Sequence, residues 1–353
     1  MERDIQGALS LPQRSLRGKG ITYDTGFFHA GESTRPVFDP QVVKREMSII
    51  HDDLHCNAVR ITGGNADRLA LAALHAANAG LEVWFSPFTC SLPTAELLAF
   101  LLDCAGRAEQ LRRLGAGVVF VTGAELSLFT PGFLPGATQQ ERLDLLGSPH
   151  RLRAHLPQLS PRLNAFLGQA VALVRERFGG KMSYAAIPSF ERVDWTPFDV
   201  ISVDAYWSSA FADTYDAAIC ALVAQGKPVA ITEFGCATFR GSSLNSSRGA
   251  MIVVYEGHRA VRLAGDYIRD EAEQAAHLCA LLDIFSAAGV DSAFVNTFVS
   301  YHLPHRSSPR TDLDMASYGV VKVLEDHPGC ADPGLPWLPK AAFAALAGYY
   351  QRA

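Results

Sequence analysis

The sequence predicts an α/β protein with a single (β/α)8 TIM barrel, because short β-rich apolar runs alternate along the chain with longer Ala- and Leu-rich segments of helical period. This alternation is typical of a parallel sheet covered by helices. Eight runs have strand character, and the 353 residues average about 44 for each βα unit, a size typical of the closed barrel. The candidate strands are Gly20–Tyr23, Ala58–Thr62, Glu82–Pro87, Val118–Thr122, Lys181–Ala185, Val200–Asp204, Val229–Thr232 and Ser292–Asn296.

The segments between these runs have the apolar spacing of helices. Asp, Ser or Thr precedes several of them at the N-cap position, where a side-chain oxygen accepts a hydrogen bond from a free backbone N–H. The predicted helices are Pro40–Asp53, Asp67–Ala79, Thr94–Leu114, Ser160–Phe178, Tyr215–Gln225, Glu271–Ala288 and Ala341–Tyr349. An open doubly wound sheet is the alternative fold, but no glycine-rich phosphate-binding turn follows the first strand.

Two connections are longer than a barrel requires. Leu126–Leu159 follows the fourth strand, and Phe239–Asp270 follows the seventh and contains a predicted hairpin around Glu256 and Gly257. Long loops at the carboxyl ends of barrel strands usually form the substrate cleft or a lid over it, and ordinary insertions are the alternative. We expect residues 1–15 to form an N-terminal extension and residues 16–353 to form the catalytic barrel.

Composition and charge exclude several classes of partner. The chain has 31 Lys and Arg against 36 Asp and Glu, a formal net charge of −5, which offers no basic field for nucleic acid. The N-terminus lacks the apolar run of a signal peptide, and no stretch reaches membrane-spanning length. Seven scattered cysteines without a CxxC pair indicate reduced thiols. We therefore expect a cytoplasmic protein with a small-molecule substrate, no nucleic-acid or membrane partner and no cofactor. The sequence does not indicate the number of subunits.

Two glutamates end strands at the same rim of the predicted barrel. The fourth strand ends VVFVTGAEL and delivers Glu125, and the seventh ends KPVAITEFG and delivers Glu233. Since catalytic residues of this fold lie at the carboxyl ends of strands, we expect the two carboxylates to converge. A carboxyl pair about 5–5.5 Å apart suits double displacement at an anomeric carbon. The structural alternatives are that Glu233 is a simple strand-end carboxylate and that Glu125 only begins a helix.

The ITEFG run around Glu233 resembles the nucleophile strand of the clan of retaining glycoside hydrolases with (β/α)8 barrels. Two further motifs follow the order of that clan, since CNAVRI places Arg60 at the end of strand two and DWTPFDVISVDAYW places Tyr206 just past strand six. The resemblance implies that Glu233 is the nucleophile and Glu125 the acid/base, and that Arg60 and Tyr206 lie beside the nucleophile. For Arg60, a bridge between strands at the rim is an equal alternative. The first strand, in GITYDTGF, also resembles the beginning of proteins labelled abortive-infection.

The chain departs from the pattern of this clan at two places. Ala124 stands before Glu125, where the clan usually has an asparagine that binds the sugar 2-hydroxyl. Strand eight reads FVNTFV, where many members have a tryptophan as the floor of the sugar site. Trp195 is a candidate sugar-stacking platform, although packing under strand six is the stronger alternative. The full set of expected substrate-binding residues is Tyr23, Asp24, Arg60, Trp195, Asp204, Tyr206, Asn296, Phe298 and His302.

One segment, YHLPHRSSPRTDLD, carries side chains of the metal-ligating types, namely His302, His305, Asp312 and Asp314. The proline between the two histidines prevents the helical spacing of a zinc motif. We therefore expect a loop that hydrogen-bonds the substrate, or a polar crossover before the last helix, and no metal.

Three functions are compatible with the sequence. The first is a retaining glycosidase-type hydrolase of a small intracellular glycoside, in which the charge of Glu233 keeps Glu125 partly protonated near neutral pH and produces a bell-shaped pH profile. The second uses the same carboxylates as a general acid/base pair on a non-glycoside metabolite, in specialised biosynthesis or phage defence, and is motivated by Ala124 and the missing tryptophan. The third is a non-catalytic carbohydrate-binding barrel. Fold alone does not decide among them.

Overall fold

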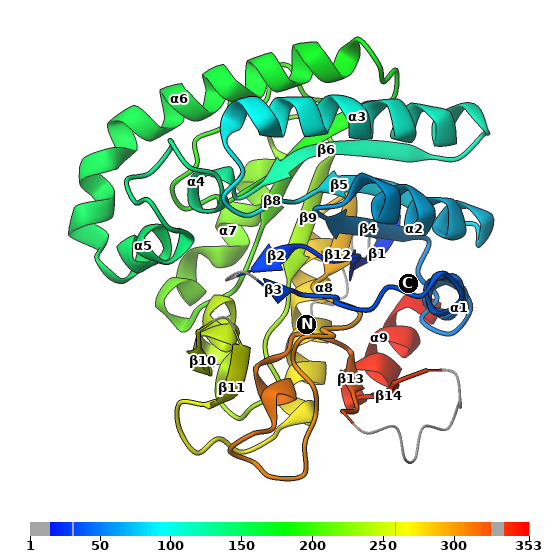
Figure 1. The fold of residues 1–353 in the computed structure, drawn as a ribbon, viewed down its shortest axis with the longest axis vertical. Coiled ribbons are helices and arrows are strands. Elements are labelled where there is room, and N and C mark those ends of the chain that lie inside the picture. The colour runs from blue at the N-terminus through cyan, green and yellow to red at the C-terminus, as the bar shows by residue number, and fades with distance from the viewer. Residues whose placement is uncertain (1–14, 30–31, 258, 326–334, 353) are drawn as a thin grey trace, which may run out of the picture.

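The computed structural model describes residues 15–29, 32–257, 259–325 and 335–352, which form the predicted closed parallel barrel (Figure 1). The strand β4 pairs back to β1 and closes it. Each barrel strand lies at a predicted strand, so the fold prediction is confirmed. The predicted extension lies outside the described residues except for residue 15. In spatial order the strands are β1 (Gly18–Asp24), β12 (Ser292–Val295), β9 (Val229–Phe234), β8 (Ile201–Asp204), β7 (Lys181–Ala186), β6 (Val118–Ala124), β5 (Glu82–Pro87) and β4 (Ala58–Gly63).

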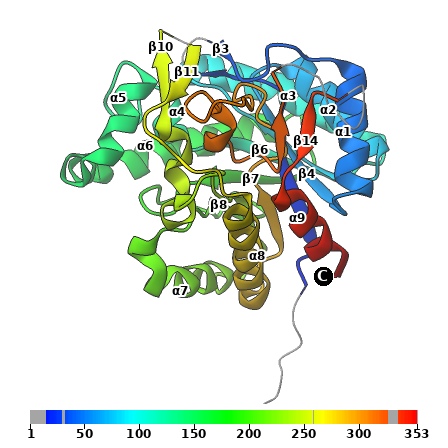
Figure 2. The same ribbon diagram turned by 90° about the horizontal axis from the view of Figure 1, so that it is seen from below.

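Helices surround the barrel, and their ends follow the capping signals of the sequence. The side chains of Asp39 and Asn65 accept backbone N–H groups at the starts of the first two, which satisfies donors that lack a partner within the helix. Neighbouring helices pack side by side, α3 with α6 and α8 with α9 (Figures 1 and 2). The bounds are α1 (Pro40–Asp52), α2 (Ala66–Asn78), α3 (Thr94–Arg113), α6 (Pro149–Arg175), α7 (Ala212–Val223), α8 (Glu271–Ala288) and α9 (Ala341–Arg352).

One predicted helix begins at a different residue in the structure. The helix α6 begins at Pro149 instead of Ser160 and continues through Pro157 and Pro161. The connection 187–200 between β7 and β8, all of which the structure describes, contains no helix. This connection instead carries turns and a buried glutamate, Glu191, that lies behind the candidate site.

Alternating side chains of the barrel strands separate two apolar layers. One face of each strand packs against the helices, and the other fills the barrel interior. Because the interior is packed with side chains, polar groups of the strands are available to a ligand only at the barrel ends. The interior cluster consists of Ala58, Trp84, Val119, Val121, Ala124, Ala185, Val200, Ala230 and Phe294.

Long loops follow four strands at the carboxyl end of the barrel. The predicted loop after β6 contains α4 (Leu126–Phe129), α5 (Gln139–Asp144) and the turn η1 (Leu145–Gly147), and the predicted hairpin after β9 forms from β10 (Val253–Glu256) and β11 (Arg259–Leu263). The sequence did not indicate the loop after β1, and for the connection after β12 it indicated only a loop or polar crossover before the last helix. The loop after β1 contains the hairpin of β2 (Phe28–His29) and β3 (Glu32–Ser33), and the connection after β12 contains η5 (Leu313–Ala316) and the hairpin of β13 (Val321–Val323) and β14 (Trp337–Pro339).

The cysteines of the described residues form no disulfide, and none of the described helices could cross a membrane. Cys56, Cys90, Cys104, Cys220, Cys236 and Cys279 are free thiols. In the part of the chain that the structure describes, every helix is too short or too polar to span a bilayer.

A buried carboxylate, Glu46 of α1, ties three parts of the fold together. It accepts hydrogen bonds from the hydroxyl of Tyr23, from Arg35 at 3.0 Å, from the hydroxyl of Tyr301 at 2.5 Å and from the indole of Trp337 at 2.9 Å. Both Glu46 and Arg35 are almost fully buried, so the ion pair cannot exchange its partners for water. The cluster therefore joins α1 to strand β1, to the loop after β12 and to β14.

We expect Glu46→Ala to lower the free energy of unfolding by about 3–5 kcal/mol, because it leaves a buried guanidinium without its counter-ion. Urea denaturation of the variant and the wild type measures the difference. The conservative variant Glu46→Gln keeps an acceptor and should lose less. A change below about 1 kcal/mol for Glu46→Ala, the size of a typical exposed pair, would contradict a structural role for this cluster.

Candidate active site

Irregular strand ends aim the two predicted glutamates at the barrel mouth. In β6 the register against β7 shifts at Gly123, whose φ of 144° is rare for residues with a Cβ atom. In β9 the register against both of its neighbours, β12 and β8, shifts around Thr232. Over this stretch β9 therefore has one residue more than β8. Such bulges turn a strand end and re-aim its side chains. They bring Glu125 and Glu233 to the carboxyl end of the barrel.

Glu233 lies at the centre of a hydrogen-bonded group whose members come from β4, β8, β9 and β12 or from the residues just past them. Arg60 donates from Nη1 to Oε1 at 2.7 Å, and the hydroxyl of Tyr206 donates to Oε2 at 2.8 Å. Asn296 donates from Nδ2 to the Tyr206 hydroxyl at 2.6 Å and to Oε2 at 3.4 Å. Arg60 is itself fully buried and fixed by the hydroxyl of Ser86 at 3.2 Å. Three donors thus orient the Glu233 carboxylate and stabilise its negative charge.

The buried guanidinium of Arg60 keeps its charge in this setting. Burial opposes ionisation, but the charges of Glu233 and Asp204 outweigh it and raise the pKa of Arg60 above its usual value. The structure therefore places a permanent positive charge directly against Glu233.

Glu125 has a different environment. It is the N-cap residue of α4, with φ of 48° and ψ of 39°, and its side chain makes no capping hydrogen bond with the described residues. The backbone of Glu125 thus begins a helix, as one of the alternatives for this residue predicts, but its side chain does not cap that helix. Burial, followed by repulsion from Asp204 and Glu233, raises the pKa of Glu125 well above the usual value for glutamate. Glu125 therefore retains a proton to higher pH than an ordinary glutamate does.

Asp204 adds a third carboxyl to the group. It pairs in register with Glu233 across β8 and β9 and is 4% exposed, and neither of its oxygens has a hydrogen-bond partner among the described residues. Burial and the charge of Glu233 raise the pKa of Asp204 well above its usual value, against the opposing effect of Arg60. Asp204 and Glu125 therefore both retain a proton to higher pH than ordinary carboxyl groups do.

We expect Asp204→Asn to raise the free energy of unfolding at pH 7 by about 1 kcal/mol or more. A carboxyl whose pKa is higher in the folded state holds a proton that the unfolded chain releases, so stability falls as pH rises from the unfolded pKa towards the folded pKa. Asparagine removes this penalty. Urea denaturation at a series of pH values measures it, and the two proteins should converge in acid. A variant less stable than the wild type at pH 7 would contradict this assignment.

The structure does not bring all predicted residues to this group. The Tyr23 hydroxyl points away from the mouth onto Glu46, and Phe298 is fully buried and packs against Tyr23 and Trp337 outside the barrel. Tyr23 faces the helix layer because side chains alternate along a strand, and Phe298, which follows β12, packs against it on the same side. Asp24 lies at the mouth, where it accepts the N–H of Gly26 at 2.7 Å and fixes the loop after β1.

Trp195 lies towards the opposite end of the barrel. Its ring packs against Phe198 at 5.8 Å between centroids, and its carbonyl accepts a hydrogen bond from Lys227, which precedes β9. The packing alternative is therefore what the structure shows, and Trp195 is not at the mouth.

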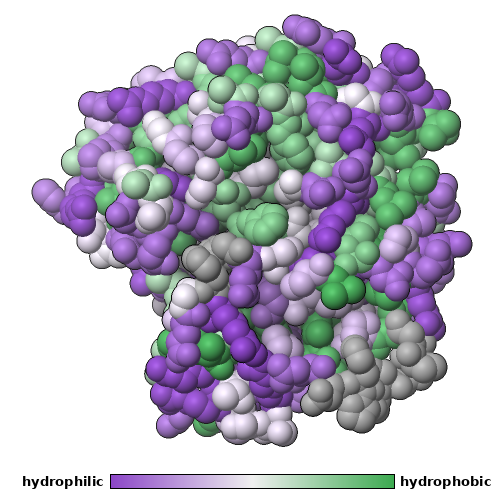
Figure 3. Space-filling model, in the orientation of Figure 1, coloured by the Kyte–Doolittle hydropathy of each residue, from purple (hydrophilic) through white to green (hydrophobic). Residues whose placement is uncertain are grey.

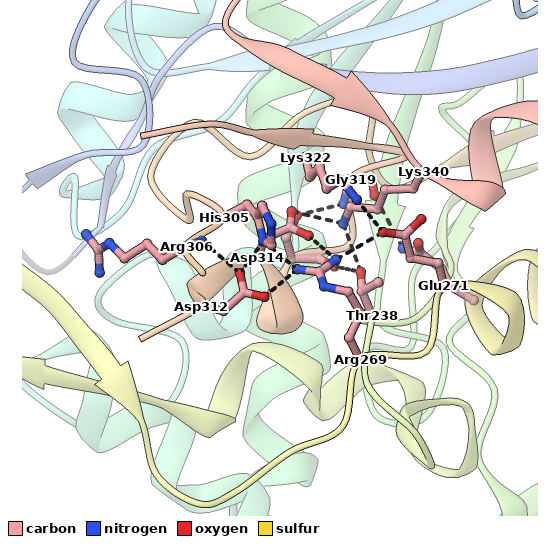
Figure 4. A network of polar contacts seen from close by, with 12 residues as sticks. Thr238, Arg269, Glu271, His305, Arg306, Asp312, Asp314, Gly319, Lys322 and Lys340 are labelled. Carbon is pink, nitrogen blue, oxygen red and sulfur yellow. Dashed lines mark hydrogen bonds and ion pairs between the residues drawn. The ribbon is translucent and has the colours of Figure 1, made fainter. Parts of the chain in front are cut away.

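The histidine and aspartate segment forms an ion-pair network instead of a ligand cluster (Figure 4). Arg269 donates to Asp312 at 2.7 Å and to Asp314 at 2.8 Å, and His305 contacts Asp312 at 2.9 Å. The buried Lys340 lies 3.0 Å from Asp314. Each aspartate is thus neutralised by a cation. The described residues contain no cluster of three or more His, Cys, Asp or Glu side chains that could hold a metal ion. The network joins the loops after β9 and β12 to the segment before α9.

His302 lies in a surface pocket beside the mouth and not in the Glu233 group. This pocket is formed by the hairpin β2–β3, the hairpin β10–β11 and the loop after β12, and its lining includes Glu32, Tyr255, Arg259, His302 and Arg306. The sequence did not indicate this pocket, since its residues come from three distant segments.

Sequence reasoning also missed an aromatic row at the mouth. Phe27 after β1, Phe88 after β5 and Phe129 in α4 are each partly exposed. Their rings contact one another edge to face, with centroids 4.7 Å apart for Phe27 and Phe88 and 5.0 Å apart for Phe88 and Phe129. The face shown in Figure 3 mixes apolar and hydrophilic residues, with apolar surface near its centre.

Comparison with known proteins gives likeness in structure only. No protein-family model and no curated protein matches the chain. Two solved structures of family GH113 β-mannanases superpose, one a β-1,4-mannanase with a TM-score of 0.60 and 16% identity over 96% of this chain and 100% of the other. The second, from Alicyclobacillus acidocaldarius, gives a TM-score of 0.58 and 15% identity over 98% of this chain and 99% of the other.

A family 5 glycoside hydrolase from Prevotella bryantii also superposes, with a TM-score of 0.53 and 12% identity over 96% of this chain and 98% of the other. None of these structures supports the resemblance to abortive-infection proteins. At such identities the likeness concerns the fold. The chain therefore has the (β/α)8 barrel that these glycoside hydrolases share, over nearly the whole length of each chain.

Proposed function

We propose that the protein is a retaining glycosidase-type hydrolase in which Glu233 is the nucleophile and Glu125 the acid/base. The observation that carries the proposal is the unequal environment of the two carboxyls. Glu233 receives hydrogen bonds from Arg60, Tyr206 and Asn296, whereas burial and nearby negative charges raise the pKa of Glu125. Two carboxyls held in opposite protonation states are what double displacement requires.

In the first step the ionised Glu233 attacks the anomeric carbon, and the bond to the leaving oxygen breaks as Glu125 gives that oxygen its proton. The product is a glycosyl ester on Glu233 and an ionised Glu125. In the second step Glu125 takes a proton from water, the water oxygen attacks the anomeric carbon, and Glu233 leaves as a carboxylate. Arg60 and Tyr206 hold Glu233 in place throughout, and no cofactor is needed for these steps.

The remaining side chains at the mouth support a small carbohydrate substrate. The row of Phe27, Phe88 and Phe129 offers apolar faces and edges for the C–H groups of a sugar ring, in the absence of a tryptophan on strand eight. Ala124 lies in the barrel interior and is 1% exposed, so the 2-hydroxyl would need a different partner from the usual asparagine. Asn296, which already contacts Glu233, is the amide nearest to that role.

Turnover of a panel of aryl glycosides by the wild-type protein tests the proposal. The panel varies the sugar at a constant nitrophenyl leaving group, and proton NMR of the first-formed sugar gives the anomeric configuration. We expect at least one sugar to be released with retention of configuration. Inversion would contradict the assignment of Glu233 as nucleophile. Tight binding of a sugar without turnover would instead support a binding barrel, and neither binding nor turnover would favour acid/base chemistry on a non-glycoside.

A further inference from the structure

A buried tyrosine and a buried glutamate hold the turn that presents Glu125. The N–H of Leu126 donates to the hydroxyl of Tyr184 at 2.9 Å, and the N–H of Ser127 donates to Oε1 of Glu191 at 3.1 Å. The Tyr184 hydroxyl in turn donates to both oxygens of Glu191, at 3.1 and 3.0 Å. Tyr184 lies on β7, and Glu191 lies in the helix-free connection that follows it.

These contacts matter because the backbone at Glu125 has a conformation that residues with a Cβ atom rarely adopt. Its φ of 48° lies in the left-handed region, where the side chain crowds the following carbonyl. The N–H of Glu125 donates to the carbonyl of Ala185 at 2.9 Å, so three successive N–H groups are bound by β7 and the connection after it. The surrounding structure therefore fixes the conformation that Glu125 itself disfavours.

Burial raises the pKa of Glu191 above its usual value, and the hydrogen bonds from Ser127, Ile187 and Tyr184 oppose this by stabilising the carboxylate. Oε1 accepts the N–H of Ser127, Oε2 accepts the N–H of Ile187 at 2.9 Å, and both accept Tyr184. The two backbone N–H groups can only donate to Glu191, and the Tyr184 hydroxyl bridges both of its oxygens. Its two oxygens are therefore fully occupied by the turn and by Tyr184, and Glu191 is 4% exposed.

We propose that Glu191, together with Tyr184, is a positioning residue for the acid/base Glu125: it fixes the backbone turn that aims Glu125 and adds a negative charge behind it. This inference rests on the proposed function for its kinetic consequences. Glu125 faces Glu191, Asp204 and Glu233 as acidic groups and Arg60 as the opposing cation. Removal of the charge on Glu191 should therefore lower the pKa of Glu125 while Asp204, Glu233 and Arg60 still act on it.

The kinetic test compares Glu191→Ala and Tyr184→Phe with a matched control. The control is Glu109→Gln, since Glu109 is also a buried glutamate that accepts a backbone N–H, from Gly179 at 3.1 Å, but lies on α3 away from the mouth. We expect Glu191→Ala to lower kcat about 100-fold and Tyr184→Phe about 10-fold, with KM within about threefold, because the acid is misplaced and not removed. The alkaline limb of kcat/KM should move to lower pH in Glu191→Ala and stay in place in the control.

A second readout needs no substrate. Carboxyl 13C NMR of glutamate-labelled protein, with the Glu125 signal identified by its loss in Glu125→Gln, follows the titration of Glu125 directly. We expect its midpoint to fall in Glu191→Gln, which removes the charge at similar volume, and to remain unchanged in Glu109→Gln.

The two readouts separate failure of this inference from failure of the proposed function. An unmoved midpoint, or a kcat within about threefold of the wild type for Glu191→Ala, would show that Glu191 only supports the fold and would overturn the inference. A shifted midpoint without glycosidase turnover would retain the positioning role and reject the proposed reaction.

Discussion

Replacement of Glu233 by Gln should lower kcat/KM about 10⁴-fold or more, because the variant lacks the nucleophile of the first step. The amide also disturbs the local hydrogen bonds. Arg60, Tyr206 and Asn296 all donate towards the two oxygens of Glu233, so one of these donors would meet the amide NH2. Steady-state kinetics on the best aryl glycoside of the panel measures the loss.

Two comparisons keep this result interpretable. Glu109→Gln serves again as a matched control, and its kcat/KM should stay within about threefold of the wild type, as for a substitution remote from the reacting groups. Circular dichroism and thermal unfolding show whether Glu233→Gln remains folded. A folded Glu233→Gln variant that retains a tenth or more of the wild-type kcat/KM would contradict the role of Glu233 as nucleophile.

Replacement of Glu125 by Gln should produce a loss that depends on the leaving group. Substrates with poor leaving groups need the proton of Glu125 and should slow about 10³-fold, whereas nitrophenyl glycosides should slow much less in the first step. Burial, with repulsion from Asp204 and Glu233, raises the pKa of Glu125. The wild-type kcat/KM should therefore be maintained to higher pH than an ordinary glutamate would allow, and fall as rising pH removes this proton.

The pH profile supplies the check on this second prediction. Since glutamine carries no titrating proton, the alkaline limb of kcat/KM should disappear in Glu125→Gln for substrates that still react. Pre-steady-state kinetics with leaving groups of graded acidity measures the dependence on the leaving group. An equal loss for every leaving group, together with an unchanged alkaline limb, would show that Glu125 is not the acid.

The barrel was predictable because its signals are local. Each strand is a short apolar run, and strand ends in a parallel barrel meet at one rim. Arg60 and Tyr206 were expected beside Glu233 because their motifs follow the order of the glycoside hydrolase clan, and Asn296 was expected only as a substrate-binding residue. In the structure Arg60 lies within β4, whereas Tyr206 and Asn296 lie just past β8 and β12. Tyr23 was expected at the mouth, but its side chain faces the helices because side chains alternate between the two faces of a strand. Phe298 follows β12, and its ring packs against Tyr23 and Trp337.

Other features could not be read from the chain because they depend on long-range contacts. Glu191 and Tyr184 contact the turn at Glu125 from the next strand and its connection, and no local pattern marks them. The aromatic row of Phe27, Phe88 and Phe129 is assembled from three separate loops. The early start of α6 also escaped prediction, because Pro157 and Pro161 lie inside it and proline usually ends or begins a helix.

The measurement that tests the central claim most directly is covalent trapping with activated 2-fluoro glycosides, followed by intact-protein mass and peptide mapping. The fluorine slows both steps, and an activated leaving group lets the first step outrun the second, so the glycosyl ester accumulates. We predict one glycosyl group for each wild-type chain, on the peptide that contains Glu233, and none on Glu233→Gln. An adduct on another residue, or no adduct with a glycoside that the wild type turns over, would contradict the assignment of Glu233 as nucleophile.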